Sequence, residues 1–354
     1  MGIISSSGSS GDAACVTVFF SPGEYQMVER EPTRNLGLEL VRVTEAAALS
    51  AARQMGRGDK IASDKAAVDA MRLVLNSIEM DGVVVIGEGE KDEAPMLYNG
   101  EKVGSGHGPR VDIAVDPIDG TRLLSTGNPN AIATVAISPR GTMFNPGPFV
   151  YMNKLAVGPE AKGRIDIEAP ILDNLKVIAK ARGKDLDDLT CVILDRPRNA
   201  EMVAEIRKTG ARIRLLSDGD VAGSLMTAWG NSGIDVLFGI GGTPEGVLSA
   251  CALRAMGGEL QGKLYARSED ELRRGTEMGY DFHKVLTMND LVSSEDVFFA
   301  ATGITDGELL RGVKYTGNGA RTDSVEVRGL TGTIRQIRAT HRVDKLNRLS
   351  SIQY

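Results

Sequence analysis

The sequence predicts an α/β protein, and three observations lead to that prediction. Apolar residues make up 42% of the 354 residues, so the chain can bury substantial cores. Aromatic residues make up only 5% while Gly is abundant, which favours tight packing of helices on sheets over an aromatic core. From about residue 175, strand-like apolar runs alternate strictly with helical segments, which is typical of a parallel sheet with crossover helices.

The first part of the chain contains an unpatterned segment and two helices. Residues 1–32 are rich in Ser and Gly without sustained periodicity, so we expect a mobile N-terminal extension there. Apolar residues from Leu36 to Ala51 recur at spacings of three and four, which predicts an amphipathic helix that ends before the GRG at 56–58. A second helix is expected from about Asp64, with apolar residues as far as Ile78 on one face, to a stop at the MDG of residues 80–82.

Strands follow these helices. The runs VVVIGEGE from residue 83, VDIAVD from 111 and AIATVAIS from 131 read as strands, and MFNPGPFVYM (143–152) is expected to complete the sheet region. In the second run, Val111, Ile113 and Val115 alternate and should face the core, while Pro117 should stop the strand. We therefore expect an α+β domain over residues 33–175.

The remaining chain, residues 176–354, is expected to form an α/β domain. TCVILD, RIRLLSD and IDVLFGI predict strands, and each is followed by a helical segment, at 199–210, 220–229 and 244–258. VFFAATGI (297–304) predicts a further strand, and DSVEVRGLTGTIRQI (323–337) predicts a closing hairpin.

Composition also excludes several classes of partner. The net charge is −6 and no Lys/Arg cluster is interleaved with aromatic residues, so nucleic acid is not an expected partner. No run approaches 18 apolar residues, so a membrane is not expected either. Cys15, Cys191 and Cys251 are widely spaced, which indicates neither a disulfide framework nor a zinc site and fits a reducing cytoplasm.

Four segments place carboxylates at the predicted ends of strands or helices. Their acidic residues are Asp64 in GRGDKIASDKAA, then Glu88, Glu90 and Asp92 in VVVIGEGEKDEAP, then Asp116 and Asp119 in DPIDGT, and Glu245 in GIGGTPEGV. Each segment alone has an ordinary structural explanation, as a helix N-cap, a strand end, a partner of a helix dipole or a solvated loop.

Taken together, the four segments indicate a metal site. The carboxyl ends of strands in an α/β fold gather at one edge, where ligands bind. Carboxylates crowded there repel one another unless cations neutralise them. The four segments contain no His or Cys, so the ligands are oxygen atoms, which select two or more Mg²⁺ or Mn²⁺ ions over zinc or copper.

An all-oxygen site with several metal ions, close to Thr121 and Lys60, suits phosphate ester hydrolysis. Such a site binds phosphate, activates water and stabilises the leaving alkoxide, which predicts a phosphomonoesterase. Arg196 and Arg198 in LDRPRNA stand at a strand end and could bind phosphate, although surface solubility explains them equally well on sequence alone.

Six ordered motifs carry a family resemblance. GRGDK, VVVIGEGEKDEAPMLYNGEKVG, AVDPIDGT, ILDRPR, SDGDVAG and GIGGTPEGV closely resemble class II fructose-1,6-bisphosphatase of the bacterial type, within the lithium-sensitive, metal-dependent phosphatase superfamily. The similarity covers about residues 33–350. It implies a layered αβαβα sugar-phosphatase fold and hydrolysis of the 1-phosphate of fructose 1,6-bisphosphate in gluconeogenesis. It also implies a cytoplasmic homo-oligomer, either a dimer or a tetramer.

The resemblance also assigns roles to residues. Asp64 and Glu88 would hold one metal ion, and Asp116, Asp119 and Glu245 the second. Lys60 would balance phosphate charge, Thr121 would orient the attacking water, and Glu90 or Asp92 would accept its proton. Substrate contacts would come from Asp119, Gly120, Thr121, Tyr151, Arg196, Pro197, Arg198, Asp218, Gly219, Asp220 and Gly242.

Four alternatives stay open at this stage. The first is an inositol or nucleotide phosphatase of the same superfamily. The second is a dual fructose and sedoheptulose bisphosphatase, which the short segment of eleven residues between Gly104 and Asp116 argues against. The third is a non-catalytic sugar-phosphate sensor, which would be expected to lack some of the carboxylates. The fourth, a covalent mechanism through Asp116 or Asp119, ranks low because the two aspartates are three residues apart and do not form a DxD motif.

Overall fold

The computed structural model of the chain describes residues 35–89, 97–317 and 319–349, together with residue 352. The predicted N-terminal extension and the candidate residues Glu90 and Asp92 lie outside these ranges.

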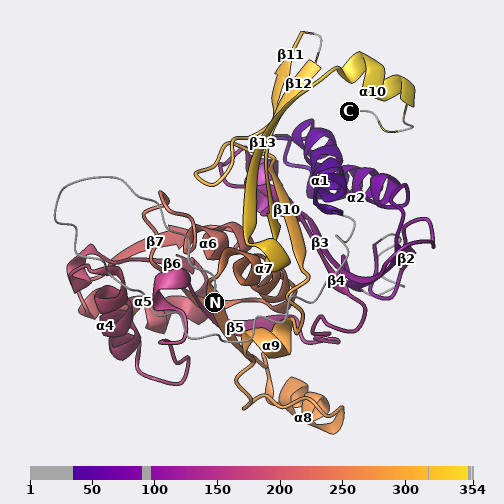
Figure 1. The fold of residues 1–354 in the computed structure, drawn as a ribbon. Helices are drawn as coiled ribbons and strands as arrows, with labels where there is room; N and C mark the ends of the chain where they lie inside the picture. The colour runs from indigo at the N-terminus through magenta and orange to yellow at the C-terminus, as the bar shows by residue number, and fades with distance from the viewer. Residues whose placement is uncertain (1–34, 90–96, 318, 350–351, 353–354) are drawn as a thin grey trace, which may run out of the picture. The chain divides into compact units, whose positions relative to one another are not determined.

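Two β-sheets form the framework (Figure 1). The first has the strand order β11-β12-β10-β4-β3-β1-β2, with β13 paired to β12. Its strands are β1 (Asp81–Ile86), β2 (Lys102–Val103), β3 (Arg110–Asp119), β4 (Ile132–Pro139), β10 (Phe298–Gly303), β11 (Lys314–Thr316), β12 (Gly319–Arg328) and β13 (Thr333–His341). The β12–β13 pair confirms the predicted closing hairpin.

The second sheet has the order β7-β6-β8-β5-β9. Its strands are β5 (Tyr151–Val157), β6 (Thr190–Leu194), β7 (Arg212–Leu216), β8 (Val236–Gly242) and β9 (Glu259–Leu264). As predicted, β6 runs parallel to both β7 and β8. By contrast, β5 is antiparallel to both of its neighbours, β8 and β9.

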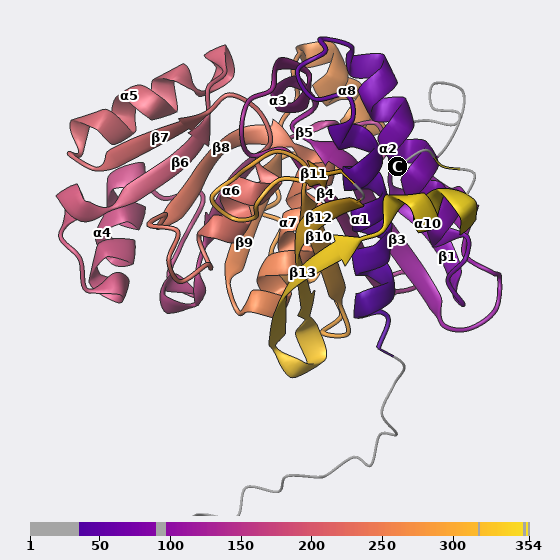
Figure 2. The ribbon, with the colours of Figure 1, turned by 90° about the horizontal axis from the view of Figure 1, so that it is seen from above.

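Helices form three layers around these sheets, as Figure 2 shows from above. The helices α1 (Gly37–Ala52) and α2 (Lys60–Leu75) cover the outer face of the first sheet, and α6 (Val221–Met226) and α7 (Thr243–Met256) lie between the sheets. The outer face of the second sheet is covered by α4 (Ile171–Arg182) and α5 (Ala200–Lys208). This order of layers confirms the expected αβαβα fold. The remaining helices are α3 (Thr121–Thr126), α8 (Glu269–Glu277), α9 (Met288–Leu291) and α10 (Val343–Leu349), with 3₁₀ turns at Pro159–Ala161, Leu186–Asp188, Pro197–Asn199 and Gly329–Thr331.

The core follows the same layers. Ile113 on β3 packs with Leu40 of α1 in the outer cluster, while its neighbour Ala114 belongs to the cluster with Leu248 of α7. Successive side chains of a strand point to opposite faces, so β3 contributes to two cores at once. Ile178 of α4 belongs to a third cluster on the far side of the second sheet. These clusters explain why β3 and its neighbours are apolar on both faces.

Three expectations about local structure were wrong. The second helix begins at Lys60 and not near Asp64, because the Asp59 carboxylate accepts a hydrogen bond of 2.9 Å from the backbone N–H of Ala62 and caps the helix there. Pro117 does not stop its strand: β3 continues to Asp119, with a register shift between Asp116 and Asp119. Proline has no N–H to donate, so it interrupts the ladder with β4 without ending the strand. The segment 143–150 does not form a strand, and Met143 makes one isolated bridge.

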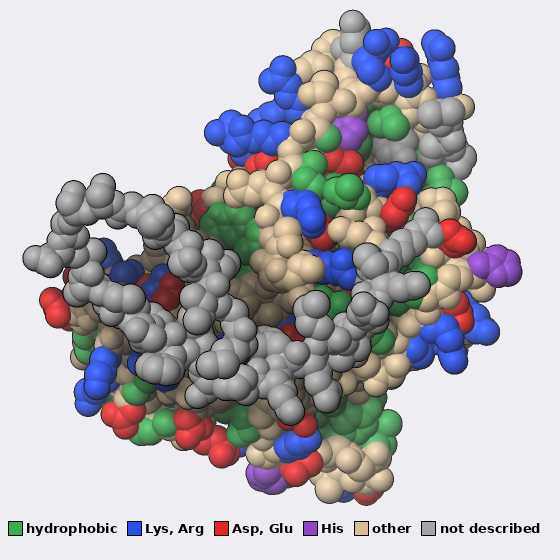
Figure 3. Space-filling view, in the orientation of Figure 1, with side chains coloured by type: hydrophobic (Ala, Val, Ile, Leu, Met, Phe, Trp, Pro, Cys, Tyr) green, Lys and Arg blue, Asp and Glu red, His purple; other side chains and the backbone are tan. Residues whose placement is uncertain are grey.

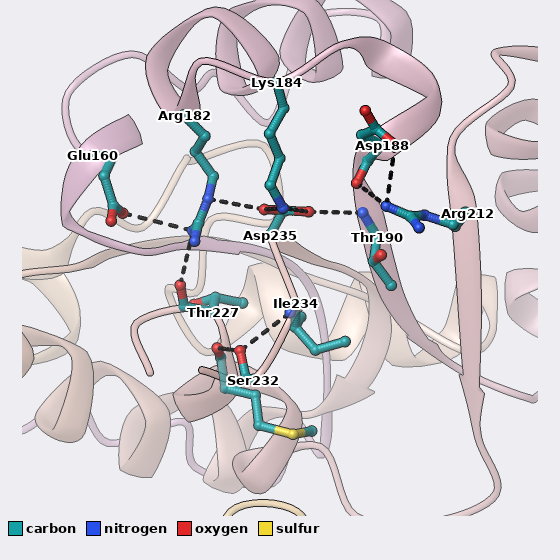
Figure 4. Close-up of polar contacts among 11 residues, drawn as sticks. Glu160, Arg182, Lys184, Asp188, Thr190, Arg212, Thr227, Ser232, Ile234 and Asp235 are labelled. Carbon is teal, nitrogen blue, oxygen red and sulfur yellow. Dashed lines mark hydrogen bonds and ion pairs between the residues drawn. The ribbon is translucent and has the colours of Figure 1, made fainter. Parts of the chain in front are cut away.

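A buried aspartate ties the second sheet to its helical layer (Figure 4). Asp235, just before β8, is fully buried and lies 2.8 Å from Arg182 Nε and 2.7 Å from Lys184 Nζ. It also accepts a hydrogen bond of 2.8 Å from the N–H of Thr190, the first residue of β6. One carboxylate therefore joins the end of α4 to the starts of two parallel strands.

Basic side chains gather over the β12–β13 hairpin and α10 (Figure 3). Several are paired with acids: Arg338 lies 3.4 Å from Asp323, and Arg342 lies 2.9 Å from Asp344. Exposed pairs of this kind contribute little to stability, so we read this surface as a solvated face.

The sheets divide the chain differently from the predicted domains. The chain enters the second sheet at β5 and returns to the first at β10. The division into residues 33–175 and 176–354 stays a prediction. Among the described residues, no helix is both long and apolar enough to cross a bilayer.

Candidate active site

A cavity of about 450 Å³ lies where the ends of strands from both sheets meet. Many of the predicted site residues line it. They are Glu88, Asp116, Asp119, Gly120, Thr121, Tyr151, Arg196, Arg198, Asp218, Gly219, Asp220, Gly242 and Glu245. The fold therefore brings together three of the four acidic segments and both arginines.

Other predicted residues stand outside the lining. Asp64 and Lys60 lie on the first turns of α2, with Lys60 exposed, and Pro197 is exposed on a 3₁₀ turn. Asp64 still reaches the cavity indirectly, because it accepts a hydrogen bond of 3.0 Å from Thr121, which lines the cavity.

The end of β3 is shaped by a glycine. Gly120 has φ 97°, in the left-handed region that favours glycine, and it starts α3. A Cβ at this position would stand 2.9 Å from Leu123 Cδ1, which is too close for a real side chain. Glycine allows the chain to turn here, so that Thr121 lines the cavity two residues after Asp119, the last residue of β3.

The second sheet contributes two arginines, each held in place. Arg196 lies 2.7 Å from the Oδ1 atom of Asp218, and the other oxygen of Asp218 accepts a hydrogen bond of 3.2 Å from the N–H of Arg122. Arg198 donates from Nε to the carbonyl of Ile240 at 2.9 Å. These bonds fix where the two guanidinium groups can reach in the cavity.

An aromatic ring forms part of the same wall. The Arg198 guanidinium stands over the Tyr151 ring, 4.5 Å from its centroid, and Arg267 lies 5.7 Å from the same centroid. Such stacking orients a guanidinium and stabilises it over the ring face. Sequence reasoning did not single out Arg267, which follows β9 and approaches Tyr151 only in the fold.

Burial and mutual repulsion raise the pKa of the cavity carboxylates. Burial, together with the charges of Asp64 and Glu245, raises the pKa of Glu88 to about 7. Burial, and next repulsion from Asp119, raises the pKa of Asp116 well above its ordinary range. Burial, and next repulsion from Asp220, raises the pKa of Asp119 in the same way. The carboxylates therefore crowd one another in the way that the sequence indicated.

Asp64 and Glu245 follow the same trend. Burial raises the pKa of Asp64, although the hydrogen bond from Thr121 and the charge of Lys60 act against the shift. Burial and then Asp220 raise the pKa of Glu245, while Lys154 lowers it. A positive charge in the cavity would therefore stabilise the ionised form of both carboxylates.

These residues fit a hard divalent cation in donor chemistry and charge. The Oε2 atom of Glu245 is buried and has no hydrogen-bond partner among the described residues. An orphaned carboxylate oxygen in an acidic cavity is the kind of donor that Mg²⁺ or Mn²⁺ accepts. Within the described ranges, no group of three or more His, Cys, Asp or Glu side chains is already arranged to hold a metal ion.

One buried residue beside the cavity was not identified from the sequence. Lys154 on β5 is 1% exposed and lies 2.5 Å from the Oδ2 atom of Asp220. A lysine inside the apolar strand YMNKLAV was the available signal, because a fully buried lysine needs a partner. Nothing in the sequence identifies Asp220 as that partner.

The αβαβα fold is the one that the resemblance to the layered sugar phosphatases implied, and the cavity combines carboxylates with arginines as such a phosphatase requires. A family model described as "Bacterial fructose-1,6-bisphosphatase, glpX-encoded" matches residues 34–341. The chain belongs to this family of class 2 fructose-1,6-bisphosphatases, which confirms the resemblance drawn from the six motifs.

Individual relatives agree with this assignment. The chain is 49% identical over 325 residues to fructose-1,6-bisphosphatase 1 class 2 of Escherichia coli (strain K12), covering 88% of this chain and 96% of that protein. The class 2 enzyme of Shigella flexneri matches with the same identity and coverage.

Among solved structures, the extragenic suppressor protein suhB of Bartonella henselae is similar with a TM-score of 0.32 and 14% identity, over 56% of this chain and 74% of that one.

Proposed function

We propose that this protein removes the 1-phosphate of fructose 1,6-bisphosphate, giving fructose 6-phosphate and inorganic phosphate, as a step of gluconeogenesis. Membership of the class 2 fructose-1,6-bisphosphatase family supports the reaction and the substrate. The observation that carries the proposal at the level of the site is one cavity that combines crowded carboxylates with Arg196 and Arg198. The arginines match the charge of the phosphates, and the carboxylates can hold the cations that the reaction needs.

The proposed metal ligands are Asp64 and Glu88 for one ion, and Asp116, Asp119 and Glu245 for the second. Bound Mg²⁺ or Mn²⁺ supplies positive charge that polarises the phosphoryl group and lowers the pKa of water. The repulsion among these carboxylates in the cation-free protein supports a need for such charge. Which metal binds, and that two or more ions bind, are parts of the proposal.

Thr121 is proposed to orient the attacking water. Its hydroxyl proton is directed to Asp64 Oδ1 at 3.0 Å, with the carbonyl of Ile118 as a second acceptor at 3.3 Å. A hydroxyl whose proton is engaged in this way offers its lone pairs, so Thr121 can accept a hydrogen bond from water and aim its oxygen at phosphorus. Glu90 and Asp92 are proposed acceptors of the water proton, and both lie outside the described residues.

The phosphates and the sugar are proposed to contact the wall from the second sheet. Arg196 and Arg198 would bind phosphate oxygens, with Tyr151 supporting Arg198 from below its guanidinium plane. The loop around Gly219, together with Gly242, would bring backbone groups close to the sugar hydroxyls. Lys60, at the start of α2, would balance phosphate charge from the exposed side.

Location and assembly complete the proposal. We propose a cytoplasmic homo-oligomer, a dimer or a tetramer. Within the part of the chain that the structure describes, Cys191 and Cys251 form no disulfide. Burial raises the pKa of each thiol to about 12, which fits a reducing compartment and no nucleophilic role.

A substrate panel tests the proposed function. Phosphate release should be measured on fructose 1,6-bisphosphate, sedoheptulose 1,7-bisphosphate, inositol monophosphate and a nucleotide monophosphate, with Mg²⁺ and Mn²⁺ in parallel. We expect fructose 1,6-bisphosphate to give the highest kcat/KM with either ion. A preference for inositol phosphate or nucleotide would contradict the proposal, and binding of sugar phosphate without turnover would indicate a sensor.

A further inference from the structure

Lys154 and Asp220 form a buried ion pair beside the proposed metal ligands. Lys154 and Asp220 are 1% and 4% exposed, and the Lys154 Nζ atom lies 2.5 Å from Asp220 Oδ2. The same ammonium donates to the carbonyl of Gly242 at 2.9 Å. Burying a lone charge is costly, so each member of this pair depends on the other.

Asp220 belongs to a turn that contacts the Asp119 carboxylate. Asp119 Oδ2 accepts a hydrogen bond of 3.4 Å from the N–H of Ala222, two residues after Asp220. On the other side of Asp220, a Cβ added to Gly219 would stand 3.1 Å from Asp119 Oδ1. The Asp119 carboxylate therefore lies against the same short segment, Gly219 to Ala222, that contains Asp220.

Glu245 lies near the same pair. A Cβ added to Gly241 would overlap Asp220 Oδ2 and stand 2.9 Å from Lys154 Nζ, while a Cβ added to the next residue, Gly242, would overlap the Glu245 carboxylate. Asp220 consequently lies close to two proposed metal ligands, Asp119 and Glu245, and it lines the cavity with them.

A carboxylate in this position would be an additional oxygen ligand if nothing else held it. Its charge is instead matched by Lys154, and its main-chain carbonyl is fixed by hydrogen bonds of 2.9 Å from both the N–H and the Oγ of Ser224. Lys154 itself cannot swing away, because its side chain is enclosed by β8 and the first turn of α7, where a Cβ on Gly246 would stand 3.3 Å from Lys154 Cδ.

We propose that Lys154 is a positioning residue that keeps Asp220 out of the metal-ligand set, an inference that rests on the metal site of the proposed function. The ion pair leaves Asp119 and Glu245 available to the cations and prevents a further carboxylate from holding them too tightly. An extra anionic ligand would reduce the positive charge that the cations offer to phosphate.

Manganese binding to the substrate-free enzyme tests this inference, with titration followed by electron paramagnetic resonance. Lys154→Met keeps the length of the side chain and removes its charge, so we expect Asp220 to join the ligands and the Mn²⁺ affinity to rise at least about threefold. Lys154→Met with Asp220→Asn should return the affinity to within about twofold of the wild-type value. Asp220→Asn alone should leave it within about twofold, because Asp220 is not a ligand in the wild-type protein.

Two results would overturn the inference. One is unchanged or weaker Mn²⁺ binding by a folded Lys154→Met variant, which would make the pair a purely structural element. The other is a loss of about tenfold or more in affinity for Asp220→Asn, which would make Asp220 a ligand, and this variant decides the matter even if Lys154→Met fails to fold. Absence of Mn²⁺ binding by the wild-type enzyme would instead count against the proposed metal site.

Discussion

The hydroxyl of Thr121, at the start of α3, donates a hydrogen bond of 3.0 Å to Asp64 Oδ1 on α2. This bond joins the DPIDGT segment to the GRGDKIASDKAA segment across 57 residues of chain. It links the threonine that is proposed to orient the attacking water to a proposed metal ligand. Replacing Thr121 removes this hydrogen bond but leaves the Asp64 carboxylate in place.

Replacing Thr121 by Ala should lower kcat by about 100-fold, because the attacking water loses the group that aims it. Mn²⁺ affinity should change little, since Asp64 keeps its carboxylate. Thr121→Ser keeps the hydroxyl and is the matched control, which should retain most of the activity. Steady-state kinetics on fructose 1,6-bisphosphate provide the measurement, and unchanged turnover in Thr121→Ala would remove this role.

Replacing Glu245 by Gln should stabilise the cation-free protein, because it removes one of several mutually repelling carboxylates. We expect its thermal midpoint in chelator to rise by roughly 2 °C. At 100 times Kd, Mn²⁺ should stabilise the wild-type protein by about 2.7 kcal/mol, and the variant should show a smaller gain at the same concentration. If the variant is less stable than the wild type in chelator and is stabilised as much by Mn²⁺, Glu245 neither repels the other carboxylates nor binds the metal ion.

Replacing Asp235 by Ala should destabilise the fold, because it leaves Arg182 and Lys184 without their buried partner. The expected loss is about 3–5 kcal/mol in free energy of unfolding. Asp188→Ala removes an exposed carboxylate near Arg212 and is the control, with an expected loss below about 1 kcal/mol. Urea unfolding measures the loss in each variant. Equal losses would show that the buried ion pairs of Asp235 in Figure 4 stabilise the fold no more than an exposed pair does.

The capping box of α9 should make stability depend on pH. Burial raises the pKa of Asp290, but hydrogen bonds from Lys284 and Thr287 outweigh it and lower the pKa to about 2, from an ordinary 3.8. A carboxyl whose pKa is lower in the folded state stabilises the fold above the unfolded-state pKa and loses this effect as the pH falls towards the folded value. The stability gap between the wild type and Asp290→Asn should therefore be full at pH 6 and shrink between pH 4 and pH 2. A gap in urea unfolding that does not change with pH would contradict this assignment.

Much of the fold could be predicted from the sequence because its signals are local. The alternation of Val111, Ile113 and Val115 identified β3, and the spacing of apolar residues from Leu36 identified α1. The predicted end of β3 and the predicted start of α2 were both wrong. At α2, the Asp59 carboxylate accepts a hydrogen bond from a backbone N–H and fixes a helix start that apolar patterning does not record. At β3, the strand continues past Pro117 through a register shift to Asp119, which depends on its pairing with β4.

At the site, too, the features encoded locally in the sequence could be predicted, whereas contacts between distant segments could not. Carboxylates and arginines at strand ends could be predicted to gather, since an α/β topology brings strand ends to one edge. The pairing of Lys154 with Asp220 and the approach of Arg267 to Tyr151 could not, because they depend on the order of strands β8, β5 and β9. The antiparallel placement of β5 carries Lys154 to the turn that holds Asp220, and no motif encodes that placement.

The most direct test of the central claim is ³¹P NMR of the purified enzyme with fructose 1,6-bisphosphate and Mn²⁺. We expect one equivalent of inorganic phosphate and fructose 6-phosphate as the sugar product. Fructose 1-phosphate as the product, or an unchanged bisphosphate spectrum with Mn²⁺ and with Mg²⁺, would contradict the account.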